Sequence, residues 1–163
     1  MYRKFLKNFA AVSVILLILA AGLVVLFDPF FHYHEPVGPL KAVLTKKEYQ
    51  SIGTIRNFSY DSLIMGSSTA EDFNNRWFDD AFGVTAVKAI KSSGVTAQLD
   101  YYMEQAFESR KIKMVFYSLD LFALGGDPDI EFPDESMPLY LYDRNPFTDV
   151  NYVLNKDVIF EDI

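Results

Sequence analysis

Residues 60–69 read Tyr-Asp-Ser-Leu-Ile-Met-Gly-Ser-Ser-Thr, and this short stretch decides how the chain is expected to fold. Ser62 to Met65 is a mostly apolar run that stops at Gly66, which is the pattern of a buried β-strand. Small hydroxyl residues follow the glycine directly. The stretch therefore predicts a strand that ends in a tight turn.

The residues after this strand alternate between helical and strand patterns. Val84–Ile90 and Met114–Leu119 are two further runs typical of strands. Two segments between the strands have apolar side chains at helical spacing: Phe73, Trp77, Phe78 and Ala81, ended by Gly83, and Leu99, Tyr102, Met103, Ala106 and Phe107. The order β-α-β-α-β predicts an α/β domain with a parallel sheet, in a three-layer, flavodoxin-like arrangement. Beyond it, we expect an acidic loop over residues 129–143 and a last helix that opens at residues 146–148.

Small and polar residues follow each of the three predicted strands: Gly66-Ser67-Ser68-Thr69, Ser92-Ser93-Gly94 and Asp120. The carboxyl ends of parallel strands lie at one edge of a sheet, where α/β proteins bind ligands. A hydroxyl at the first turn would lie at a helix N-terminus, whose free N–H groups favour negative charge and can hold the oxyanion of acyl transfer. The sequence therefore predicts a polar site at this edge, without a cofactor or a metal.

Each of these residues also has a purely structural interpretation. Ser68-Thr69-Ala70-Glu71 matches a capping box, in which Ser68 caps a helix and Glu71 bonds back to it. Ser92-Ser93-Gly94 is an ordinary turn sequence, and Asp120 alone suits a helix cap. From the pattern alone, both interpretations stay open.

Composition limits the classes of function. The chain has 163 residues, half of them apolar and 16% aromatic, with a formal net charge of −7 and no cysteine. This length suits one packed domain with an appendage. The acidic balance leaves no basic stripe for phosphates and so argues against nucleic acid as a partner. The lack of cysteine excludes disulfides, thiol catalysis and thiolate metal sites.

The N-terminal segment has the pattern of a membrane anchor. Phe9 to Phe27 is an uncharged run that spans about 28 Å as a helix at about 1.5 Å per residue, enough for a hydrocarbon core. Arg3, Lys4 and Lys7 precede it, so the positive-inside rule places residues 1–8 in the cytoplasm and exports the rest. In the alternative, a cleaved signal peptide, the apolar core is shorter and small residues follow it. We expect residues 9–27 to hold a single-pass protein in the lipid bilayer of the cell membrane.

Residues 28–59 are expected to form an extracytoplasmic stalk and lead-in, followed by the domain over residues 60–163. Prolines exclude a continuous helix over residues 28–38. His32 and His34 would face the same side of an extended segment. They could supply part of a metal site, but no third ligand is evident nearby, so we expect a structural or interfacial role. Aromatic residues of this region are expected at the outer membrane interface: Phe27, Phe30, Phe31 and Tyr33.

Several of these stretches together resemble one known family. Residues 60–68 are similar to the first conserved block of the SGNH (GDSL-like) hydrolases. They most resemble its membrane-anchored, bacterial cell-envelope branch, which includes the protein that assists D-alanylation of lipoteichoic acid and the polysaccharide O-acetylation proteins. Residues 28–34 (Asp-Pro-Phe-Phe-His-Tyr-His), Ser93-Gly94 and Leu119-Asp120 recur in anchored members. The resemblance covers the anchor, the stalk and the first three strands, and implies an SGNH-like domain.

The resemblance implies roles for three positions. Ser68 would be the nucleophile, and its own N–H and that of Gly94 would donate to the oxyanion. Asp120 stands where the family has an asparagine as the third oxyanion donor, which is a departure from its pattern. The family takes its catalytic histidine, and an aspartate three residues before it, from near the C-terminus of a longer domain. No histidine follows His34 here, so we expect a truncated, N-terminal portion that is inactive alone.

Two classes of function remain open. The first is a serine esterase or acyltransferase that acts on a cell-envelope glycan or teichoic acid, with Ser68 as the acyl carrier. The second is a non-catalytic, anchored binding or assembly module that uses the same edge of the sheet. The motif favours the first class for the family. The missing base favours the second for this chain, because serine is a weak nucleophile without one.

Overall fold

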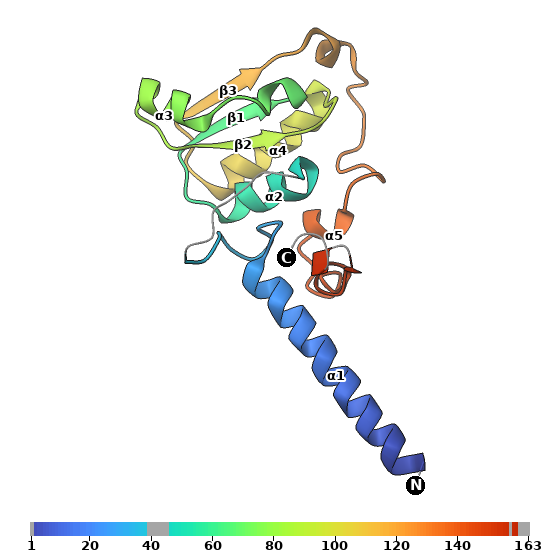
Figure 1. Ribbon diagram of the computed structural model, residues 1–163. Coiled ribbons are helices and arrows are strands. Elements are labelled where there is room, and N and C mark those ends of the chain that lie inside the picture. The colour runs from blue at the N-terminus through green and yellow to red at the C-terminus, as the bar shows by residue number, and fades with distance from the viewer. Residues whose placement is uncertain (1, 39–45, 157, 160–163) are drawn as a thin grey trace.

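The computed structural model describes residues 2–38, 46–156 and 158–159, and it shows a long helix that projects from an α/β unit (Figure 1). The elements, in chain order, are α1 (Tyr2–Phe27), α2 (Lys47–Asn57), β1 (Ser62–Gly66), the 3-10 helix η1 (Ser68–Ala70), α3 (Asn75–Phe82), β2 (Ala86–Ile90), α4 (Thr96–Ser109), β3 (Met114–Ser118), the 3-10 helix η2 (Leu121–Gly125), α5 (Leu139–Tyr142) and α6 (Val150–Val153).

Three parallel strands form the sheet, in the order β2-β1-β3. Gly66, the last residue of β1, lies beside Ile90 of β2 and Ser118 of β3, so the three strands end level with one another. The predicted β-α-β-α-β order and the parallel sheet are confirmed. The boundaries differ slightly, since β2 begins at Ala86 and not at Val84, and β3 ends before Leu119.

Helices lie on both faces of the sheet. On one face, Phe78 of α3 packs against Phe116 of β3 and near Ile64 of β1. On the other face, α2 and α4 pack over the alternate residues of the strands, including Leu63 of β1. The central strand β1 is consequently buried at every residue.

α2 is part of this unit, although the sequence placed residues 47–57 in a lead-in before the domain. Its buried positions combine small and polar residues with two isoleucines: Gln50, Ser51, Ile52, Gly53, Thr54 and Ile55. Such a helix has no apolar stripe, which is the pattern that identifies a helix in a sequence. Gly53 allows the turn after α1 to come close, because a Cβ there would lie 2.4 Å from the carbonyl oxygen of Phe30.

The two edge strands of the sheet differ in how their outer backbone groups are bonded. At the β2 edge, side chains bond the backbone of Ala86. Asp79 Oδ1 accepts its N–H at 2.8 Å, and Asn75 Nδ2 donates to its carbonyl at 2.8 Å. Ser51 Oγ likewise bonds both backbone groups of Ile90, at 3.0 and 3.2 Å. These contacts block the pairing of a further strand with β2.

The β3 edge has no such cover within the described residues. None of its five residues is buried, in contrast to β1. Large apolar side chains are exposed on this strand and just beyond it: Met114, Tyr117, Leu119, Leu121, Phe122 and Leu124. The sheet therefore ends on this side in an exposed apolar strand that is free to pair.

α1 projects away from the α/β unit (Figure 1). Tyr2–Phe27 is long and apolar enough to cross a membrane, a property that it shares with N-terminal signal sequences. Val24 is the one residue of this helix that is buried. Most of its other residues are exposed.

Residues 28–38 do not form the expected extended stalk but turn back onto the domain. Asp28 and Phe31 adopt φ angles of 42° and 58°, in the left-handed region. Phe30 and Phe31 are 2% and 6% exposed and pack against Tyr152 and Phe58, so their expected placement at the membrane interface was wrong. The reason is tertiary, because Phe30 packs against Tyr152 of α6 and Phe31 packs against Phe58, which follows α2.

Candidate functional site

The turns that follow the three strands meet at one edge of the sheet, as the parallel topology requires. They begin after Gly66, Ile90 and Ser118, which are neighbours in the register. The segments predicted to form a polar site therefore lie near one another in space. Their detailed contacts differ from those expected.

Asp120 joins the turn after β1 to the turn after β3. Its carboxylate accepts a hydrogen bond from the buried Ser67 hydroxyl. Thr69 Oγ1 also donates to it, at 3.2 and 3.3 Å from the two carboxylate oxygens. An ionised carboxylate only accepts hydrogen bonds, so Asp120 cannot donate to an oxyanion in the way the family's asparagine would. In this structure Asp120 instead fixes the conformation of the turn that carries Ser68.

Ser68 lies on the exposed side of that turn, as the first residue of η1. Its hydroxyl makes no hydrogen bond to the rest of the described chain, and it therefore faces outward without a base. The capping-box interpretation was wrong, because Ser67 is the cap and accepts from the Thr69 N–H at 3.4 Å. Glu71 instead forms an ion pair with Lys47 of α2.

The N–H of Gly94 is already bonded. It donates to the carbonyl oxygen of Lys91 at 2.9 Å and closes a tight turn in which Ser93 adopts a φ of 51°. A Cβ at Gly94 would lie 2.9 Å from the Lys91 side chain, which explains the glycine. The expected oxyanion donor is thus occupied in this conformation.

A cleft of about 460 Å³ lies beside this turn, between the N-terminus of α4 and η2. Its walls include Val95, Thr96, Asp100, Leu124 and Asp127. Ser68 is not among the residues that line it. The cleft combines an apolar wall with carboxylate groups that accept hydrogen bonds.

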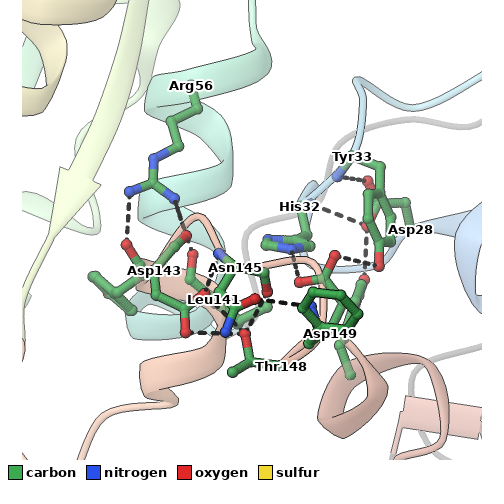
Figure 2. Close-up of polar contacts among 12 residues, drawn as sticks. Asp28, His32, Tyr33, Arg56, Leu141, Asp143, Asn145, Thr148 and Asp149 are labelled. Carbon is green, nitrogen blue, oxygen red and sulfur yellow. Dashed lines mark hydrogen bonds and ion pairs between the residues drawn. The ribbon is translucent and has the colours of Figure 1, made fainter.

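The two histidines lie away from this edge, in the turn that follows α1. His32 Nε2 is 3.1 Å from Asp149 Oδ1, and the Tyr33 hydroxyl donates to the other oxygen of Asp149 at 3.2 Å (Figure 2). Burial and the negative charge of Asp149 raise the pKa of Tyr33. No cluster of three metal-binding side chains occurs among the residues that the structure describes. These contacts give His32 a structural role in holding the end of the described chain.

His34 caps the C-terminal end of α1. Its Nδ1 lies 2.6 Å from the Glu35 carbonyl oxygen and its Nε2 lies 2.8 Å from the Val25 carbonyl oxygen. Carbonyl oxygens only accept, so this geometry is complete only when both ring nitrogens carry a hydrogen. The contact with Glu35 does most to raise the pKa of His34. A cation at this position is also favoured by the helix dipole.

A second polar cluster, which the sequence did not predict, surrounds Asp28. This carboxylate is 1% exposed and accepts backbone N–H groups from three successive residues, 32 to 34, at 2.7–3.0 Å. It also accepts the hydroxyl of Tyr152 at 2.7 Å, and that hydroxyl accepts the Phe30 N–H at 3.2 Å. Burial raises the pKa of Tyr152, and the charge of Asp28 adds to the shift. The only local signal was the Asp-Pro pair, which favours a turn.

No protein-family model, curated protein or solved structure matches the chain. The arrangement of its residues therefore carries the argument about function.

Proposed function

We propose that this chain is a membrane-anchored, SGNH-like module of the bacterial cell envelope that takes part in acyl transfer to or from an envelope polymer. Residues 9–27 would span the bilayer, residues 1–8 would lie in the cytoplasm and the α/β unit would lie outside. Ser68 would be the acyl carrier. The observation that carries this proposal is the position of Ser68, exposed at the carboxyl edge of β1 on a turn fixed by Asp120.

No imidazole base lies near Ser68 among the described residues, so we propose that Ser68 depends on a base supplied from outside them. The exposed β3 edge supports this, because parallel sheets are normally covered and extended until their apolar strands are buried. Further strands that pair with β3 would bring the missing aspartate and histidine to the same edge. By itself the chain would have no useful turnover.

A non-catalytic binding or assembly module is the second candidate. Two contacts favour it: the Gly94 N–H is bonded to Lys91, and Asp120 is bonded to Ser67. In that case the cleft beside α4, with acceptors from Asp100 and Asp127, would hold the hydroxyl groups of an envelope glycan. The two candidates differ in one measurable property, which is the reactivity of Ser68.

Chemical rescue tests that reactivity. The purified full chain should hydrolyse an activated ester poorly, and added imidazole should increase the rate by acting as the missing base. After subtraction of the hydrolysis that imidazole causes without protein, the increase should disappear in Ser68→Ala and persist in Ser109→Ala, which removes an exposed serine at the far end of α4. Equal rates for the parent chain and Ser68→Ala at all imidazole concentrations would exclude the acyl-carrier role and favour the binding module.

The membrane span has its own test. The expressed protein should fractionate with membranes and resist carbonate extraction, because the apolar surface of α1 is exposed along nearly its whole length. Recovery of soluble protein with a new N-terminus after Ala21 or Gly22 would show a cleaved signal peptide instead.

A further inference from the structure

The end of the described chain packs beside the outer end of α1. Figure 1 shows the red segment that contains α6 next to the last turns of this helix. The contact covers Val24, which is 0% exposed, while its neighbours Leu23 and Val25 remain 48% and 40% exposed. One side of α1 is therefore in contact with protein at this level, and the other sides are open.

The position of this contact along α1 places it at the boundary of a bilayer. The uncharged run of α1 spans about 28 Å, which is close to the thickness of a hydrocarbon core. Val24 is only about 5 Å along the axis from Phe27, where that run ends. Protein that packs on Val24 must therefore lie against the boundary between acyl chains and headgroups.

Three apolar side chains of this segment point away from the domain core. Phe147 is 87% exposed, Val150 is 50% exposed and Leu154 is 42% exposed. Aromatic and aliphatic side chains at this depth gain free energy by entering the boundary region.

Polar groups of Asp143, Asn145 and Thr148 are bonded to one another within the loop (Figure 2). Asn145 Oδ1 accepts the Phe147 N–H at 3.1 Å, and Thr148 Oγ1 donates to both carboxylate oxygens of Asp143 at 2.9 Å. Arg56 of α2 donates to the carbonyl of Asp143 and ties the loop to the domain. These bonds lower the cost of bringing this part of the loop close to an apolar layer.

We propose that Phe147, Val150 and Leu154 form a second membrane contact, in which they enter the lipid boundary beside α1. The inference rests on the proposed span of α1. The partner is the bilayer itself, because α6, which carries Val150, contacts the end of the anchor. This contact would hold the domain against the membrane, so that its orientation relative to the lipid surface is fixed.

Single cysteines test the proposal, since the natural chain has none. The full chain is placed in vesicles of phosphatidylethanolamine and phosphatidylglycerol, and each variant carries one environment-sensitive dye. Phe147→Cys reports the patch, and Leu121→Cys is the control because the two side chains are equally exposed, at 87% and 88%. Ile18→Cys, within α1, reports the span.

Nitroxide groups on the lipid chains should quench the dyes at positions 147 and 18 several-fold more than the dye at 121. Iodide in the water should show the opposite order. Unchanged Trp77 fluorescence checks that each variant is folded. If lipid nitroxides quench the dye at position 18 but iodide reaches position 147 as easily as position 121, the span stands and this inference is wrong. Shielding of 147 from both quenchers would indicate a protein partner and would also overturn it. No lipid quenching at 18 would refute the span, and the inference with it.

Discussion

The hydroxyl of Tyr152 connects the end of the described chain to the turn after α1, and its removal should destabilise the protein. In Tyr152→Phe the ring stays in place, but the bonds to Asp28 (2.7 Å) and to the Phe30 N–H (3.2 Å) are lost. A hydrogen bond to a charged group contributes about 1.5–3 kcal/mol, and a buried N–H without a partner costs about 1–3 kcal/mol. Asp28 keeps three backbone donors, so we expect a net loss of about 2–4 kcal/mol in the free energy of unfolding.

Urea unfolding of the full chain in detergent micelles measures this loss, with Trp77, the single tryptophan, as the fluorescent reporter. For a slope of about 2 kcal/mol per molar urea, the midpoint should fall by about 1–2 M. Hydrogen exchange at the Phe30 amide should accelerate as well. Tyr117→Phe is the matched control, because Tyr117 is 38% exposed and its hydroxyl has no hydrogen bond in the described part of the chain. An equal midpoint for the two variants would refute the reasoning.

Three further outcomes are expected. Gly53→Ala should destabilise the protein despite the better helix propensity of alanine, since its Cβ would lie 2.4 Å from the Phe30 carbonyl oxygen. Gly22→Ala, with no atom within 4 Å of its Cβ, should cost nothing in the same urea unfolding experiment. Because the pKa of His34 is raised in the folded state, His34 should stabilise the fold fully at pH values below the pKa that it has in the unfolded chain. This stabilisation should be lost as the pH rises through the folded-state pKa of His34. An NMR titration that gives His34 a pKa at or below that of a peptide histidine would contradict this. Burial raises the pKa of Tyr60 to about 12, so its contribution to stability should be present below pH 10 and lost between about pH 10 and 12. Ultraviolet titration of tyrosinate checks this, and ionisation near pH 10 in the folded state would disagree.

Elements with strong local patterns were predicted correctly. The strand at Ser62, the helix that ends at Gly83 and the stripe of α4 each have a periodicity that favours one structure. α2 was missed because its buried face is small and polar. Ser68 was placed correctly in the turn after β1, but its neighbour Ser67 proved to be the residue that caps this turn and bonds Asp120. Two adjacent serines have the same side chain, so the sequence alone does not distinguish them. The direction in which the backbone leaves Gly66 decides which of the two is buried.

The sequence by itself determined the apolar character of α1, the parallel order of the strands and the edge of the sheet at which the polar turns meet. Those properties depend on periodicity, on runs of apolar residues and on the handedness of strand crossovers, all of which act locally. Only the tertiary structure decided that residues 28–38 fold back, that Phe30 is buried and that α6 packs beside the anchor. The bond that fixes this region joins Asp28 to Tyr152, which are 124 residues apart. No local pattern specifies such a pair, because the buried charge of Asp28 is stabilised only when the folded chain brings its donors together.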